Sequence, residues 1–160
     1  MKRLSKRAVA GIVLTLAFLF SADCPITGQE KSVRPGINKP FENPEVKEFA
    51  GKFEVESREI FARRQEILAA CKLKPGLIVA DIGAGTGLFT RLFARTVSPG
   101  GKVFAVDIAP KFIDHIEKTC KEQGLKNVVG VVCQQDSVAL PANSIDLAFI
   151  CDIYRGMIPV

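Results

Sequence analysis

Four apolar runs predict β-strands, and the first of them is nearly continuous, as expected for a strand buried on both faces of a sheet. They lie at 77–82, 102–108, 127–133 and 144–151. Each run is short and bounded by Gly, Pro or polar residues, which favours strands over buried helices. The sequence therefore predicts four strands in its second half.

Between these runs, apolar residues recur at intervals of three and four, which predicts amphipathic helices. One helix is expected from about residue 57 to the "KPG" at 74–76, with Ser57 as its N-terminal cap. A second is expected over 86–97. A third begins at Pro110, which suits the first helical position, and ends before Gly124.

Alternating strands and helices predict an α/β fold with parallel βαβ units and right-handed crossovers. Such a sheet binds ligands at the carboxyl ends of its strands. An acidic residue falls at this position in each of the four cases: Asp81, Asp107, Asp136 and Asp152.

The first 56 residues show a different pattern. Residues 1–28 combine a basic start with an uncharged apolar run at 8–20, which predicts a signal peptide or an N-terminal anchor. We expect export or membrane anchoring, with membrane contact through 8–20, or a cytoplasmic domain if the segment is an anchor with the domain inside. Residues 29–56 are rich in proline and read as a linker. The folded domain is expected over 57–160.

Composition and charge exclude several classes of function. The net charge is +5, but four basic residues precede residue 8, and no basic stripe with interleaved aromatic residues follows. We therefore expect no nucleic-acid partner. The five cysteines and one histidine show no metal-ligand spacing, so no metal site is expected. Buried free thiols are favoured over disulfides, although export would favour disulfides.

The stretch "VADIGAGTGLFT" (79–90) places three glycines after the first strand. Their spacing is GxGxG, and Leu88 stands where a dinucleotide fingerprint has its third glycine. No GK[ST] follows, which excludes a Walker A loop. Asp81 beside the turn would repel a pyrophosphate but could place a cationic amine. Asp107, about 20 residues further on, is suitably placed to accept hydrogen bonds from ribose hydroxyls.

"VADIGAGTG" followed by "VFAVDIAP" resembles motifs I and II of the class I S-adenosylmethionine-dependent methyltransferases. "LKPGLIVADIGAGTGLFTRLFA", "SPGGKVFAVDIAP" and "LPANSIDLAFICDIY" also resemble that family, over about residues 74–154. The resemblance implies a Rossmann-like, doubly wound parallel sheet in a three-layer α/β/α arrangement. It implies S-adenosylmethionine as cofactor and methyl transfer to a small-molecule or protein acceptor.

The resemblance also assigns roles to individual residues. Gly83, Ala84, Gly85 and Gly87 would line the methionine part of the cofactor, and Asp81 would organise the turn and its contact to the amino group. Asp107 would bind the ribose, and Ile108 would pack on the adenine. Asp136, with Ser137 beside it, would accept a hydrogen bond from the adenine amino group. Cys151 would lie near the methionine end of the cofactor. Asp152 and Tyr154 are the catalytic candidates.

The family's sheet has seven strands in the order 3-2-1-4-5-7-6, and this sequence stops at "IYRGMIPV". We therefore expect a truncated domain whose C-terminal strands are missing. The fourth strand would then be an apolar sheet edge through which the chain could oligomerise. Such a chain could be inactive or bind the cofactor only.

Two other functions remain open from the sequence. One is a non-catalytic interaction module that retains the fold, and the other is a nucleotide-cofactor oxidoreductase. Leu88 disfavours the oxidoreductase, and the complete Asp81, glycine and Asp107 constellation argues against a module that has lost its ligand.

Overall fold

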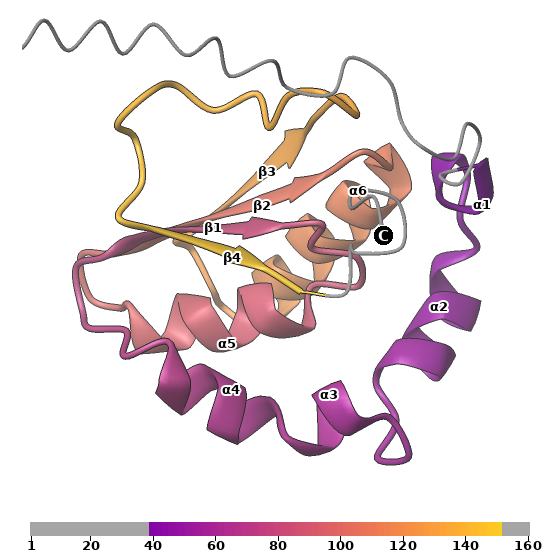
Figure 1. Cartoon of the computed structure of the whole chain (residues 1–160), viewed down its shortest axis with the longest axis horizontal. Helices are drawn as coiled ribbons and strands as arrows, with labels where there is room; N and C mark the ends of the chain where they lie inside the picture. Colours follow the sequence, from indigo (N-terminus) through magenta and orange to yellow (C-terminus); the bar gives the residue numbers. More distant parts are fainter. Residues whose placement is uncertain (1–38, 152–160) are drawn as a thin grey trace, which may run out of the picture. The chain divides into compact units, whose positions relative to one another are not determined.

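The computed structural model describes residues 39–151. Six helices and four strands lie in this range (Figure 1). The helices are α1 (Lys39–Glu42), α2 (Val46–Phe53), α3 (Glu59–Ala62), α4 (Arg64–Ala70), α5 (Leu88–Thr96) and α6 (Pro110–Glu122). The strands are β1 (Ile78–Ile82), β2 (Lys102–Asp107), β3 (Val128–Val132) and β4 (Leu147–Ile150).

The four strands form one parallel sheet in the order β3-β2-β1-β4. In the register, Ala80 of β1 pairs with Phe104 of β2 on one side and with Ala148 of β4 on the other. This order confirms the predicted α/β fold with crossover connections. It also brings the carboxyl ends of the strands, with Asp81 and Asp107, to one edge of the sheet.

Helices α5 and α6 cover the same face of the sheet, with α5 on β1 and β2 and α6 on β2 and β3 (Figure 1). Their apolar faces are buried against the strands because apolar residues recur at helical spacing. The main core cluster is Val79, Phe89, Phe93, Ala94, Val97 and Val103. Within residues 39–151, the β3–β4 connection contains no helix and passes on the side of the sheet away from α5.

Helix boundaries follow the sequence closely in α5 and α6. Pro110 occupies the first turn of α6, as predicted. Gly124 has a φ of 70° and follows the helix end, where its N–H donates to the Lys121 carbonyl oxygen at 3.1 Å. A left-handed glycine is a common way to end a helix, and the prediction for Gly124 is confirmed.

The segment before β1 differs from the prediction in two ways. Residues expected to form a linker include α2, whose Phe49 and Phe53 rings meet edge to face with 5.3 Å between centroids. The single helix expected from residue 57 is interrupted at Arg63, whose side chain pairs with Glu59 and Glu66. Ser57 does not cap it, because Arg58 occupies the cap position without a side-chain hydrogen bond.

Several predictions fall outside the described residues. They include the signal peptide or anchor at 1–28 and the catalytic candidates Asp152 and Tyr154. None of the helices between residues 39 and 151 has the length and apolar content that crossing a membrane requires.

Candidate functional site

The glycine turn lies between β1 and α5 and is held against the end of β2. Gly83, Gly85 and Gly87 all have positive φ angles, of 71°, 54° and 77°. The N–H groups of Gly83 and Ala84 both donate to the Val106 carbonyl oxygen, at 2.8 and 3.0 Å. Residues with a side chain rarely adopt three such angles in five positions, so the glycines are required by the turn itself.

Asp107, the last residue of β2, links the turn to the start of α6. Its Oδ2 accepts from the Gly85 N–H at 2.9 Å, and its Oδ1 accepts from the Ala109 N–H at 2.9 Å. Burial raises the pKa of the Asp107 carboxyl, and the N–H groups of Ala109, Gly85 and Ile108 oppose this rise. The sequence predicted an acid facing the turn, and the structure brings the two together.

Asp81 is buried beneath the turn, with 4% of its surface exposed. Its Oδ2 accepts a 2.6 Å hydrogen bond from the hydroxyl of Thr90, which is fully buried in α5. Burial raises the pKa of the Asp81 carboxyl to about 6, against the lowering effect of Thr90 and with a small further rise from Asp107. Near neutral pH the turn therefore lies over a carboxylate that an incoming positive charge would stabilise.

Asp81 should make the free energy of unfolding depend on pH. From about pH 4 to 6 the unfolded chain loses this proton before the folded chain does, so folding becomes less favourable as the pH rises. Since one pKa unit corresponds to about 1.4 kcal/mol, the loss approaches about 3 kcal/mol above pH 6.

Urea unfolding of the wild type and Asp81→Asn at pH 4 to 7 measures this effect. The stability of the variant relative to the wild type should rise with pH across this interval. The same substitution at the exposed Asp114 provides the baseline. A difference between Asp81→Asn and the wild type that stays constant from pH 4 to 7 would contradict the expectation.

Gly87 and Gly85 of the turn each face a side chain from another helix. A Cβ on Gly87 would lie 2.6 Å from Cγ1 of Ile116 in α6, so this position has no room for a side chain. A Cβ on Gly85 would lie 3.8 Å from the ring of Phe53, the last residue of α2. Gly87 is therefore required by packing within the domain, and Gly85 faces a side chain from the N-terminal segment.

The other predicted site residues lie around the same end of the sheet. Ile108 is half-buried after β2, and Cys151 is half-buried after β4. Burial, followed by the influence of Asp81, raises the pKa of the Cys151 thiol. Asp136 and Ser137 are exposed in a tight turn after β3, in which the N–H of Gln134 donates to the Ser137 carbonyl oxygen.

Sequence reasoning missed the residues that reach the turn from α2 and α5. Nη1 of Arg91 in α5 donates to the Thr86 carbonyl oxygen at 2.8 Å, and Nη2 of the same side chain donates to both carboxylate oxygens of Glu54, at 2.8 Å each. In the segment interpreted as a linker, the spacing of Phe49 and Phe53 was the only local signal that α2 packs on the domain. No local pattern connects Glu54 with Arg91.

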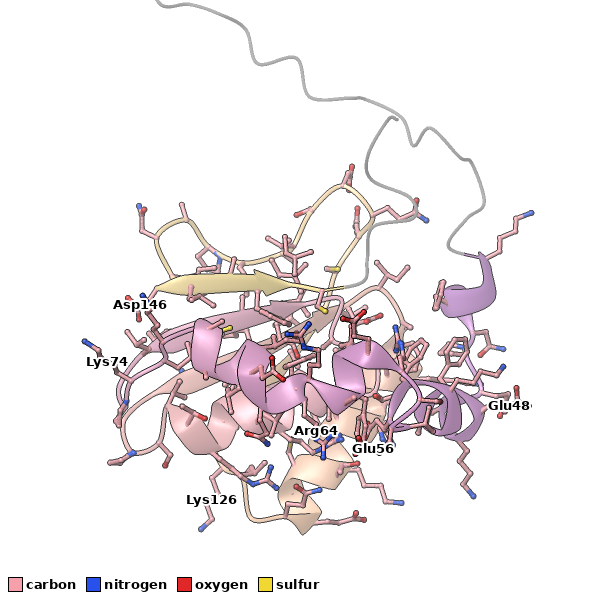
Figure 2. All side chains as sticks on the ribbon, turned by 60° about the horizontal axis from the view of Figure 1, so that its bottom comes forward. Glu48, Glu56, Arg64, Lys74, Lys126 and Asp146 are labelled. Carbon is pink, nitrogen blue, oxygen red and sulfur yellow. The ribbon has the colours of Figure 1, made fainter. Side chains whose placement is uncertain are left out.

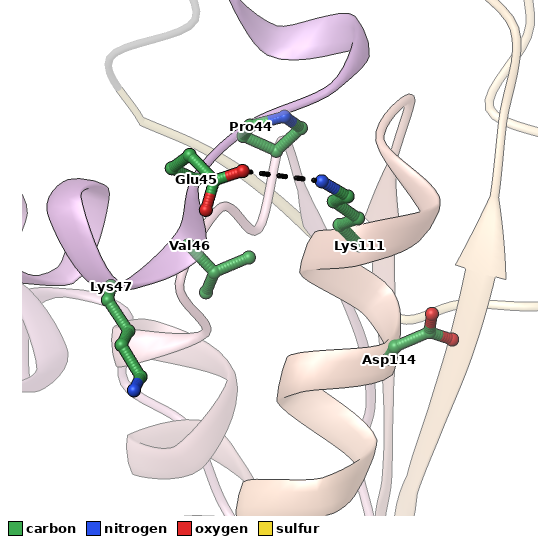
Figure 3. A pocket seen from close by; sticks show the side chains of 6 residues that line it. All are labelled: Pro44, Glu45, Val46, Lys47, Lys111 and Asp114. Carbon is green, nitrogen blue, oxygen red and sulfur yellow. Dashed lines mark ion pairs between the residues drawn. The ribbon is translucent and has the colours of Figure 1, made fainter.

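A surface hollow lies between the start of α2 and the first turns of α6 (Figure 3). It is lined by Pro44, Glu45, Val46, Lys47, Lys111 and Asp114. None of these belongs to the glycine turn, so this hollow is distinct from the predicted site. Among the described residues, no group of three His, Cys, Asp or Glu side chains is placed to hold a metal ion.

Comparison with known proteins agrees with this geometry. Residues 79–157 match the family model described as a methyltransferase domain. The chain is 37% identical over 71 residues to a protein-L-isoaspartate O-methyltransferase of Aeropyrum pernix. The aligned region covers 44% of this chain and 27% of that protein. It is 29% identical over 90 residues to the ubiquinone/menaquinone biosynthesis C-methyltransferase of Burkholderia vietnamiensis, covering 56% of this chain and 37% of that protein.

A solved structure has a similar fold. It is a SAM-dependent methyltransferase from Aquifex aeolicus, with a TM-score of 0.57, 26% identity, and coverage of 66% of this chain and 55% of that one. The fold, the glycine turn and these matches identify a class I S-adenosylmethionine-dependent methyltransferase domain in this chain. The matched region spans about a third or less of the length of the two curated relatives.

Proposed function

We propose that this domain binds S-adenosylmethionine at the glycine turn and transfers its methyl group to a small-molecule or protein acceptor. The observation that carries the proposal is Asp107, which is hydrogen-bonded to Gly85 of the turn and to Ala109 at the start of α6. One carboxylate thus fixes the two segments between which the ribose of such a cofactor would lie.

The residues at the turn fit the chemical groups of this cofactor. Asp107 keeps unused acceptor capacity, because a carboxylate has about four acceptor positions and the N–H groups of Gly85 and Ala109 occupy one each. Asp81 supplies negative charge under the turn, where a pyrophosphate would be repelled and an ammonium group attracted. The half-buried Ile108 offers an apolar surface next to the ribose position.

S-adenosylmethionine supplies an activated methyl group on a sulfonium. The protein's contribution is then mainly to align the acceptor and exclude water, and a general base is needed only for a weakly acidic nucleophile. In this chain the glycine turn fixes the backbone close to the ligand, and Asp107 orients it. Asp152 and Tyr154 remain the predicted residues nearest the acceptor.

An interaction module with the same fold is the main alternative. The turn gives a reason to prefer cofactor binding: Asp81 is buried with a raised pKa, an arrangement that lowers stability near neutral pH. A purely structural turn would be more stable with an uncharged residue at this position. An oxidoreductase is less favoured because Leu88 begins α5 where the dinucleotide fingerprint has its third glycine, which allows close packing of the helix on the strand.

Calorimetric titration of the 160-residue chain tests the proposal. S-adenosylmethionine and its demethylated product, S-adenosylhomocysteine, should bind at one site, and NAD should not. The product lacks the sulfonium charge but keeps the amino group and ribose, so similar affinities are expected. Binding of NAD in preference would support the oxidoreductase, and a folded chain that binds none of the three would support the interaction module.

A further inference from the structure

The N-terminal segment 44–54, which we call the arm, contacts the glycine turn at its C-terminal end. Phe53 is the last residue of α2, and its ring lies 3.8 Å from the position that a Cβ on Gly85 would take. Glu54 follows directly, and both of its carboxylate oxygens accept from Nη2 of Arg91. Arg91 donates at the same time to Thr86, so one guanidinium joins the arm to the turn.

The arm is attached to α6 as well. The ring of Phe49 packs edge-on against Phe112 at 5.5 Å between centroids. At the start of the arm, Glu45 forms an ion pair with Lys111 at 3.6 Å, and the close-up view shows these two side chains pointing toward each other (Figure 3). The arm is therefore fixed at both ends and in the middle.

The Glu54–Arg91 pair is the stronger of the two ion pairs. The side chains of Arg91 and Glu54 are 11% and 24% exposed, whereas those of Lys111 and Glu45 are 46% and 76% exposed. Nη2 of Arg91 donates to both oxygens of the Glu54 carboxylate while Nη1 donates to Thr86, and partial burial reduces screening by salt. Exposed single-contact pairs contribute little.

We propose that Glu54 and Arg91 are positioning residues that hold Phe53 against the turn, so that the arm forms one wall of the cofactor site. This inference rests on the proposed function. Gly85 presents its bare Cα toward Phe53 and its N–H toward Asp107, so the same residue contacts the wall and the ribose-binding carboxylate. A cofactor held by Asp107 would lie next to the Phe53 ring, which excludes water from that side.

Glu54→Gln tests this inference with little risk to folding, because the change is isosteric and Glu54 lies just after the end of α2. We expect the affinity for S-adenosylmethionine and S-adenosylhomocysteine to fall about tenfold, or by about 1.4 kcal/mol, because a neutral amide cannot form the ion pair with Arg91 that holds the arm closed. The loss should appear as faster dissociation, because the arm would open more often.

Glu48→Gln is the matched control. Glu48 lies on the same helix and pairs with Lys52 at 3.8 Å, but both side chains are about two-thirds exposed, and Glu48 points outward in Figure 2. Its replacement removes the same charge and should leave affinity unchanged. Equal affinities of Glu54→Gln and the wild type would overturn the proposal, and tighter binding by Glu54→Gln would show that the arm blocks the site.

A second readout does not depend on the cofactor. The chain has no tryptophan, so Phe53→Trp introduces a single fluorophore at the wall. In the otherwise wild-type chain its emission should be that of a shielded indole, and adding Glu54→Gln should shift it to longer wavelength and increase quenching by acrylamide. An unchanged spectrum would show that the ion pair does not hold the arm.

The two readouts separate this inference from the proposed function. If the wild-type chain binds neither compound, the proposed function fails and the wall has no cofactor to enclose, whatever the fluorescence shows. If the wild type binds and Glu54→Gln binds equally well, the proposed function stands and the role of the arm is refuted. Arg91→Lys keeps the charge but not the planar fork, and should reproduce the weaker binding of Glu54→Gln.

Discussion

Gly87→Ala is expected to lower the free energy of unfolding by about 2–5 kcal/mol. Two effects add at this position. The φ of 77° costs a residue with a Cβ about 1–2 kcal/mol. The new methyl group would also overlap Cγ1 of Ile116, a fully buried core residue, and overpacking costs about 1–3 kcal/mol. Urea unfolding followed by circular dichroism measures the sum.

Gly124→Ala separates the two effects. Gly124 has a similar φ of 70°, but no atom lies within 4 Å of the position that its Cβ would take. The free energy of unfolding of Gly124→Ala should fall only by the conformational part, which the lower entropy of the unfolded chain partly offsets. Combining Gly87→Ala with Ile116→Ala should cost less than the sum of the single changes. Equal losses in Gly87→Ala and Gly124→Ala would show that Ile116 moves aside freely.

Asp107→Ala should weaken binding of S-adenosylmethionine at least 100-fold. Two hydroxyl groups that donate to an ionised carboxylate contribute about 1.5–3 kcal/mol each, and about 2.7 kcal/mol corresponds to a factor of 100. The variant also leaves the N–H groups of Gly85 and Ala109 without their partner, so the turn should lose part of its fixed geometry. Calorimetric titration at neutral pH gives the affinity.

Asp114→Ala removes the same side chain from an exposed position of α6 and should bind like the wild type. Asp107→Asn separates charge from shape. Its amide has one acceptor oxygen, so it can satisfy Gly85 or Ala109 with that oxygen but cannot accept from both with separate oxygens, and intermediate affinity is expected. Wild-type affinity in a folded Asp107→Ala variant would show that the ribose is held elsewhere, and the proposed site would then be wrong.

These expectations show why the glycines of the turn are not interchangeable. The resemblance placed Gly85 and Gly87 together along the cofactor. In the structure Gly87 faces Ile116 inside the domain, whereas Gly85 faces Phe53 and donates to Asp107. One motif thus combines a packing requirement with a binding requirement, and a substitution series along the turn should show these as losses of stability and of affinity.

The predicted oligomer through β4, export of the chain and the missing C-terminal strands stay predictions. They concern residues beyond 151, residues before 39 or additional chains, which the described structure does not include. The acceptor of the methyl group likewise stays a proposal, because the curated relatives share only part of their length with this chain.

Sequence alone predicted the four strands, the helices α5 and α6, the parallel arrangement of the strands and the candidate site at the glycine turn. Each of these follows from local pattern: apolar runs, helical spacing, glycine at positive φ, and an acid at a strand's end. Asp107 could be assigned to the turn from sequence because adjacent parallel strands end at the same edge of the sheet.

Only the tertiary structure decided which distant residues contact the turn. Glu54 and Arg91 are 37 positions apart, and neither residue carries a local signal for the other. The pairing exists because α2 packs on α6 through Phe49 and Phe112, which brings the end of α2 to the start of α5. A proline-rich composition suggested a linker there, and the packing of the half-buried Phe49 and Phe53 against the folded domain outweighed it.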